Sequence, residues 1–263
     1  MQNQSRHPGN MRVTKNQIKL IRSLQQKKFR DREGLFVAEG DKCISDLRSA
    51  FELVLLVTPD DATPEEIRQM SSLRTPQGAI ALFRIPDTPA DFSPLGLIRR
   101  EPFLLALDGV QDPGNLGTII RTADWFGIRH ILCSRDTADC YNPKVVQATM
   151  GSLARVRLRY IDLPEALIGL RQNGLPVYGT LLDGTDIYRP DAWQPRDRGG
   201  VIVMGNEGNG LSPQVRSLVT NPLRIPSFPE GVPTAESLNV AIATAVVLAE
   251  LRHPAPSPEK CPS

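Results

Sequence analysis

The fold is decided by one stretch of sequence, FLLALDGVQDPGNLGTIIRTADWFG, which occupies residues 103–127. Its first part, Phe103–Leu107, is a short apolar run of the kind found in strands buried on both faces. A loop rich in glycine and asparagine then runs to Gly117, and Thr118–Phe126 is expected to be a helix. A buried strand, a glycine-containing loop and a helix in this order form the repeating unit of an α/β sheet.

The same alternation continues toward the C-terminus. Four further apolar runs are expected to be strands: His130–Cys133, Pro176–Leu181, Gly200–Met204 and Leu223–Ile225. Helical segments separate them, which favours a mostly parallel sheet covered on both faces. The sequence therefore predicts an α/β fold for the C-terminal half.

Two of these later strands also run into unusual loops. Gly205, Gly208 and Gly210 follow one strand, and a long loop after Ile225 leads to an apolar helix that begins near Ser237. Ligands of open α/β sheets bind beyond the carboxyl ends of the strands, so these loops are expected to form the site. The glycine spacing does not match a dinucleotide fingerprint, and no lysine follows as in a Walker loop, so a dehydrogenase is disfavoured.

Two charged side chains in these loops and helices admit alternative interpretations. Arg121 lies in an otherwise apolar or small run, where it either binds an anion or forms an ion pair with Asp124, Glu207 or another acidic residue. Glu207 either takes part in chemistry or accepts hydrogen bonds from loop amides.

The N-terminal region is basic and is expected to be a separate small α/β domain. Thr14 and Gln17 fit a capping box, and Ile18, Ile21 and Leu24 then follow at helical spacing. Lys15, Lys19 and Arg22 form one stripe on that helix. Between Arg6 and Gly34 the sequence contains nine lysines and arginines but only two acidic residues. This surplus of positive charge indicates either binding of a polyanion or an ordinary solvated surface.

The expected organisation is a disordered tail over 1–11, the small domain over 12–85, a linker over 86–101, the larger domain over 102–252 and a second tail over 253–263. No secretory signal or long apolar run is present, which favours a cytoplasmic protein. The four cysteines form no CxxC pair, so no metal site is expected.

Three motifs carry a family resemblance. Asn115–Ala123, Gly205–Gly208 and Ser237–Val240 resemble, in order and strand context, the motifs of the SpoU (TrmH-like) RNA ribose 2′-O-methyltransferases of the SPOUT superfamily. Upstream, three segments resemble the L30e-like substrate-binding domain found in many rRNA-directed members: Lys15–Arg30, Phe36–Gly40 and Thr75–Gly78. The resemblance implies a deep trefoil knot, S-adenosyl-L-methionine as cofactor, and a homodimer whose site is completed across the interface.

The resemblance also implies roles for individual residues. The expected catalytic set is Arg121, Asn115, Glu207 and Asn239. The expected cofactor contacts are Leu181, Gly205, Asn206, Ile225, Pro226, Ser237 and Leu238. The expected RNA contacts are Lys15, Lys19, Arg22, Lys27, Lys28 and Arg30. Arg121 fits an electrostatic role better than that of a base, because a guanidinium rarely loses its proton.

The RNA target is left open between 23S ribosomal RNA, which an L30e-like arm favours, and transfer RNA. A non-catalytic RNA-binding member of the fold is a further alternative, which the intact motifs disfavour. The loop Ser227–Glu236 is longer and richer in proline than the family's usual turn, so cofactor contacts near Ile225 and Leu238 are expected to shift by a residue or two.

Overall fold

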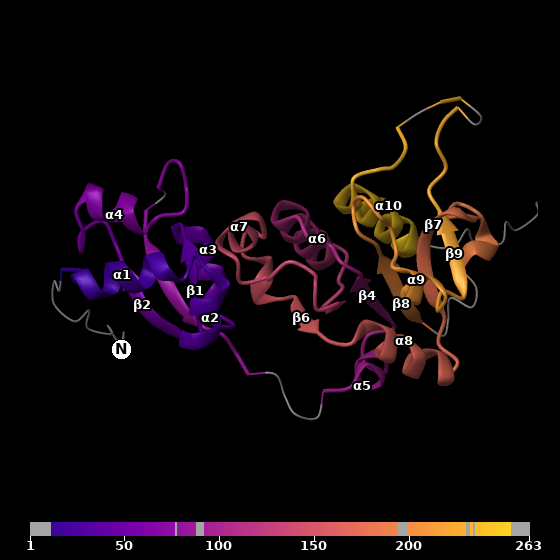
Figure 1. Ribbon diagram of the computed structural model, residues 1–263, viewed down its shortest axis with the longest axis horizontal. Helices are drawn as coiled ribbons and strands as arrows, with labels where there is room; N and C mark the ends of the chain where they lie inside the picture. The colour runs from indigo at the N-terminus through magenta and orange to yellow at the C-terminus, as the bar shows by residue number, and fades with distance from the viewer. Residues whose placement is uncertain are drawn as a thin grey trace, which may run out of the picture. The chain divides into compact units, whose positions relative to one another are not determined.

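The computed structural model describes residues 12–76, 78–87, 92–193, 199–229, 232–233 and 235–253 (Figure 1). The chain divides into two compact units. Unit 1 comprises the residues up to Asp87 together with Asp139–Ala154, and unit 2 comprises Thr88–Ala138 and everything from Arg155 onward. The predicted tail over 1–11 lies outside the described residues, as does the predicted tail over 253–263 apart from His253.

Unit 1 is an α/β unit built on a small antiparallel sheet of strand order β1-β3-β2. Its elements are α1 (Lys15–Ser23), α2 (Lys27–Glu33), β1 (Leu35–Glu39), α3 (Asp41–Leu47), β2 (Leu53–Val57), α4 (Pro64–Met70), β3 (Ile80–Arg84), α7 (Pro143–Ala148) and the 3₁₀ turn η1 (Ser152–Ala154). The predicted start of α1 is confirmed: Thr14 and Gln17 form the capping box, and Ile18, Ile21 and Leu24 are buried.

Arg30, one of the predicted RNA contacts, is buried within unit 1 and bound to other residues of the protein. Arg30 on α2 is 2% exposed. Its guanidinium pairs with Asp139 at 2.6 Å and donates to the carbonyl oxygens of Leu24 and Gln25 at 2.7 and 3.0 Å. A buried arginine with its donors engaged in this way cannot reach a phosphate, so the geometry argues against Arg30 as an RNA contact.

The segment Asp139–Ala154 belongs to unit 1 through packing as well as through this ion pair. Helix α7 contacts β1, and the Tyr141 ring lies with its centroid 4.9 Å from that of Phe36. Phe36 in turn stacks on Phe83 of β3 at 5.6 Å. An aromatic cluster therefore joins residues more than 100 positions apart in the sequence.

Unit 2 contains a six-stranded sheet of order β6-β5-β4-β8-β7-β9 in its described residues. Its elements are α5 (Pro94–Ile98), β4 (Phe103–Leu107), α6 (Pro113–Trp125), β5 (His130–Cys133), β6 (Arg157–Tyr160), α8 (Leu163–Gln172), β7 (Val177–Asp186), η2 (Pro190–Trp193), β8 (Gly200–Met204), α9 (Pro213–Arg216), β9 (Asn221–Arg224) and α10 (Val240–Arg252). All neighbouring strands pair in parallel, which confirms the predicted fold class.

Helices cover both faces of this sheet (Figure 1). On one face Leu104 and Ala106 of β4 share a core with Leu163 and Leu167 of α8. Alternate residues of a strand face opposite ways, so Leu105 belongs to the other face. Helices α6 and α10 pack against each other.

The structure differs from the sequence-based expectation in a few elements. The segment 86–101, expected to be a linker, contains helix α5, which contacts α8 and β4. Strand β6 was not predicted, and β7 continues to Asp186, five residues beyond the expected end at Leu181. In the described part of the chain, no helix combines the length and apolar character needed to span a membrane. The knot stays a prediction.

Candidate active site at the carboxyl edge of the sheet

The three sequence motifs meet at one edge of the unit 2 sheet. Strands β4, β8, β7 and β9 are consecutive neighbours and run in parallel, so their carboxyl ends lie side by side. The first motif follows β4, the second follows β8, and the third follows the loop that leaves β9. The strand order alone thus gathers segments separated by more than 120 residues.

Two hydrogen bonds fasten the loop after β4 to the loop after β8. The Ser212 backbone N–H donates to Asp108 Oδ2 at 2.7 Å, and Asn206 Nδ2 donates to the Gly109 carbonyl oxygen at 2.7 Å. Asn206 Oδ1 accepts from the backbone N–H groups of Gly208 and Asn209 at 2.9 and 3.1 Å. The Asn206 carboxamide is therefore engaged within the protein, and its predicted cofactor contact is left to its backbone.

A chain of side-chain hydrogen bonds connects all three motifs. Asn239 Nδ2 donates to Asn115 Oδ1 at 2.9 Å, and Asn115 Nδ2 donates to Glu207 Oε1 at 3.0 Å. Three of the four predicted catalytic residues are thus brought together. Each comes from a different motif.

The orientation of this chain is fixed by the start of α10. Asn239 is the N-cap, and its Oδ1 accepts from the backbone N–H groups of Ala241 and Ile242 at 2.9 and 3.3 Å. Its amide nitrogen must then face Asn115, which presents its oxygen to Asn239 and its nitrogen to the Glu207 carboxylate. The cap of one helix therefore determines which atoms the other two motifs present.

Arg121, the fourth predicted catalytic residue, is not part of this chain. It is exposed on α6, and no hydrogen bond or ion pair engages it within the described residues. The alternative ion pairs are absent there: Asp124 pairs with Arg129 and Arg155, and Glu207 accepts from Asn115. Six helical residues separate Arg121 from Asn115, which corresponds to about 9 Å along the axis and about 120° around it.

The predicted cofactor positions lie around the ends of β7, β8 and β9. Leu181 is in an irregular stretch of β7 where the pairing with β9 shifts between Thr180 and Thr185. Gly205 follows β8, and Ile225 and Pro226 follow β9, all at the carboxyl edge. Ser237 and Leu238, just before α10, are exposed.

The backbone at two glycines of this region leaves no room for side chains. A Cβ on Gly184 would lie 2.5 Å from the Leu223 backbone, and one on Gly205 would lie 2.3 Å from the Gly210 backbone. Backbone therefore approaches backbone closely between β7 and β9 and within the loop after β8. Leu181, Ile225 and Leu238 add uncharged side chains, so the residues present fit an adenosyl group held by shape and backbone contacts.

Most of the predicted RNA-contacting residues in unit 1 are accessible. Lys15, Lys19 and Arg22 are exposed and make no ion pair among the described residues. Lys27 pairs with Asp31 at 2.7 Å, while Lys28 lies 4.8 Å from the centroid of the Phe29 ring. Among the predicted RNA contacts, the side chains without an ion pair are therefore the three on α1 and Lys28 on α2.

Sequence analysis missed Asp108 as a positioning residue. Its place directly after a buried strand was the available signal, because a carboxylate there can accept from a neighbouring loop. Within the described ranges, no three His, Cys, Asp or Glu side chains gather as a metal would require.

A parallel α/β sheet with a polar, hydrogen-bonded ligand edge defines a class of enzymes that act at the carboxyl ends of their strands. Comparison with known proteins specifies the class further. Residues 102–249 match the model of the SpoU rRNA methylase family, and residues 15–73 match an MRM3-like substrate-binding domain. The chain belongs to the SpoU rRNA methylase family and is an S-adenosylmethionine-dependent RNA ribose 2′-O-methyltransferase.

Individual relatives resemble the chain over nearly its whole length. A 23S rRNA (guanosine(2553)-2′-O)-methyltransferase of Bacillus subtilis is 29% identical over 90% of this chain and 97% of its own. A putative RNA methyltransferase of the TrmH family from Porphyromonas gingivalis superposes with a TM-score of 0.79 at 40% identity, covering 91% and 98% of the two chains. An AdoMet-bound rRNA methyltransferase from Sinorhizobium meliloti superposes with a TM-score of 0.78 at 32% identity, covering 92% of this chain and 96% of its own.

The substitution Asn239→Asp separates the two roles of Asn239. Aspartate still caps α10, but it puts a carboxylate oxygen opposite Asn115 Oδ1 in place of the donor. We expect the thermal midpoint to stay near that of the wild type, while methyl transfer falls by roughly 100-fold. The measurement is single-turnover methylation beside thermal denaturation.

Asn239→Ala is the matched comparison, because it removes the cap as well and should cost about 1 kcal/mol of stability. Full activity in Asn239→Asp would show that the bond to Asn115 does not matter for the reaction.

Proposed function

We propose that this chain methylates a ribose 2′-hydroxyl of 23S ribosomal RNA. The observation that carries the proposal is the hydrogen-bonded set Asn115, Glu207 and Asn239 at the carboxyl edge of the sheet. The ribosomal target is supported by the Bacillus subtilis relative, which is named for 23S rRNA and matches the chain over both units. Transfer RNA is the second candidate target.

Bound S-adenosylmethionine supplies an electrophilic methyl group, and the protein must bring the 2′-oxygen into line with it. Glu207 is suited to orient the ribose, because only its Oε1 is engaged within the described residues and Oε2 remains to accept a hydrogen bond. Asn115 and Asn239 are positioning residues, since their carboxamides are occupied in holding Glu207.

Arg121 is proposed to bind the phosphate beside the target ribose and to stabilise negative charge that develops on the 2′-oxygen. Its exposure and its lack of a partner in the described chain leave all of its donors available for RNA. Its guanidinium stays protonated in this role, so the 2′-hydroxyl proton is released to water as the bond from oxygen to the methyl carbon forms and the bond from that carbon to sulfur breaks.

The Arg121→Ala variant tests this function. We expect methyl transfer to unmodified 23S rRNA transcripts to fall by roughly 1,000-fold, because one charged group that contacts the developing oxyanion is lost. S-adenosylmethionine affinity, measured by calorimetry, should stay within about twofold, since the cofactor contacts are elsewhere.

Arg129→Ala is the control, because Arg129 is an exposed arginine just beyond α6 that already pairs with Asp124. Methylation by the Arg121→Ala protein at the wild-type rate would refute the assigned role. Parallel assays on tRNA transcripts, with nucleotide-resolution mapping of 2′-O-methyl groups, decide between the two targets.

The basic stripe of α1 is proposed to contact the RNA backbone. Replacing Lys15, Lys19 and Arg22 together by Gln should weaken RNA binding and lower the slope of log Kd against log salt by roughly two to three. A filter-binding titration at several salt concentrations measures that slope.

A second triple variant, with Arg68, Arg84 and Arg189 changed to Gln, provides the control. Each of these arginines already pairs with a carboxylate, so the slope should change little. Equal slopes for the stripe variant and the wild type would make the stripe an ordinary solvated face.

We further propose that the enzyme is a homodimer joined through α6 and α10. These helices pack together, and both expose large apolar side chains, with Trp125 at 85% and Ile242 at 54% exposure. Exposed apolar surface of this kind is typical of a protein interface. Arg121 lies one helical turn before Trp125, on the same face of α6, so this arrangement puts it at the contact with the second copy.

Sedimentation velocity tests the dimer. The wild type should sediment as a dimer and Ile242→Glu as a monomer, because a buried unpaired carboxylate at the interface is costly. Ile168→Glu, an equivalent change at a 44% exposed isoleucine on α8, should leave the dimer intact. A monomeric wild type at micromolar concentration would contradict this arrangement.

A further inference from the structure

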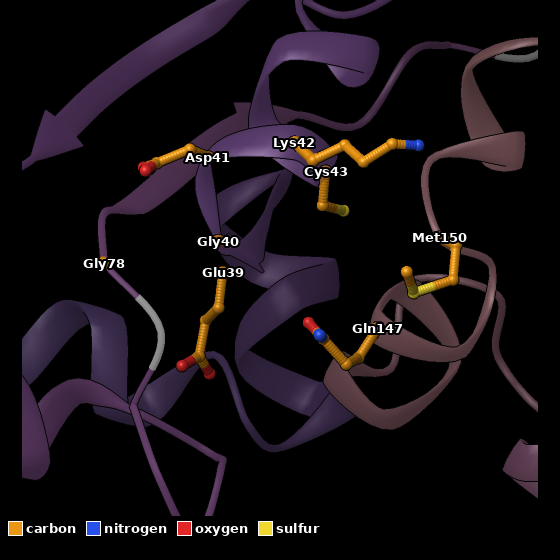
Figure 2. A pocket seen from close by; sticks show the side chains of 8 residues that line it. All are labelled: Glu39, Gly40, Asp41, Lys42, Cys43, Gly78, Gln147 and Met150. Carbon is orange, nitrogen blue, oxygen red and sulfur yellow. The ribbon is translucent and has the colours of Figure 1, made fainter.

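Unit 1 contains a cavity of about 310 Å³ that the methyl-transfer site does not use (Figure 2). One side of the cavity is formed by the end of β1 and the start of α3. The other side is formed by α7 and the residues that follow it. The lining residues are Glu39, Gly40, Asp41, Lys42, Cys43, Gly78, Gln147 and Met150. Five of these lie within the region that matches the substrate-binding domain.

The two acidic residues of the cavity are engaged with the protein. Glu39 is buried and accepts from the Ser71 hydroxyl at 2.5 Å and from the Ser72 backbone N–H at 2.7 Å. Asp41 points away from the other side chains in Figure 2, and its Oδ1 accepts from the Ala79 backbone N–H at 3.4 Å. Both carboxylates therefore accept hydrogen bonds from the protein around the cavity, which leaves few free oxygen ligands for a cation.

Two polar side chains of the cavity remain available. The carboxamide of Gln147 is partly buried, points into the space in Figure 2, and has no hydrogen-bond partner in the described parts of the chain. Lys42 is exposed at the rim and forms no ion pair there. A carboxamide can donate and accept at once, as the edge of a nucleobase requires, and an ammonium suits a phosphate.

The remaining wall is apolar and shaped by strained backbone. Met150 has φ of 51°, which is unusual for a residue with a side chain, and is 47% exposed. Strain of this kind persists where the surroundings impose it, often at ligand sites. Burial, together with the neighbouring Asp46, raises the pKa of the Cys43 thiol to about 11, so Cys43 lines the cavity as a neutral group.

We propose that this cavity holds one unpaired nucleobase of the RNA substrate, with Gln147 reading its edge, Met150 lying against it and Lys42 contacting the adjoining phosphate. The volume is near the lower end for ligand sites, which suits a single base. Sequence-specific recognition of RNA depends on unstacked bases of this kind. The inference rests on the proposed RNA methylation and adds a base-reading site to it.

Gln147→Ala in the full-length protein tests the proposal. We expect the KM for the 23S rRNA transcript to rise by roughly fivefold to tenfold, the loss expected for a hydrogen bond to a base, with kcat nearly unchanged. Gln172→Ala, the same change at an exposed position on α8, should leave both constants at their wild-type values. Met150→Gly should weaken binding in the same way without destabilising the protein, because glycine adopts the same φ freely.

Photo-crosslinking distinguishes base binding from a purely structural role of Gln147, because only base binding predicts a crosslink at the cavity. Transcripts carrying 4-thiouridine or 6-thioguanosine are irradiated with the protein, and the crosslinked peptides are mapped. We expect a crosslink in the peptides containing Cys43 or Met150. Crosslinks confined to other parts of the chain, or an unchanged KM in Gln147→Ala, would overturn the base-reading site while RNA methylation stands. Absence of methylation of any RNA by the wild type would instead overturn the proposed function.

Discussion

The carboxyl edge of the sheet that forms the candidate active site depends on one polarised chain of hydrogen bonds, which runs from Asn239 through Asn115 to Glu207. Its direction is set by the N-cap of α10, because the backbone amides of Ala241 and Ile242 require an oxygen from Asn239. Reversing either carboxamide alone would bring two like atoms together, and reversing that of Asn115 would also leave the Glu207 carboxylate without its donor. The secondary structure of one helix therefore orients a carboxylate that is distant in sequence, and it does so without any charged partner.

The parallel sheet brings the three motifs close enough to form this chain of hydrogen bonds. Because β4 and β8 are adjacent and parallel, their loops leave the sheet together, and Asp108 and Asn206 tie them directly. The apolar strands contribute position, and the polar loops contribute chemistry. A reaction that depends on alignment suits such an edge, since its groups are held before the RNA arrives.

The sequence predicted the parts of the fold that rest on local signals. The capping box at Thr14 and the buried strand Phe103–Leu107 are examples, because propensity, pattern and burial agree there. Strand β6 was missed because it is short and carries two arginines, as edge strands often do. The continuation of β7 was missed because Asp183 and Gly184 disfavour strands, and only the pairing with β9 restores it.

For the site, the sequence predicted which loops meet but not how each charge is used. The sequence analysis assigned both Arg30 and Arg121 to an anionic ligand, yet their environments in the structure are opposite. Arg30 is neutralised by Asp139, a residue 109 positions away that no local pattern could link to it. Arg121 has no such partner in the described chain. A buried ion pair gives an arginine a structural role, whereas an exposed, unpaired guanidinium keeps its full charge for a ligand. Tertiary contacts thus distinguish the two arginines, because a buried ion pair holds Arg30 while Arg121 keeps a charge that a ligand can use.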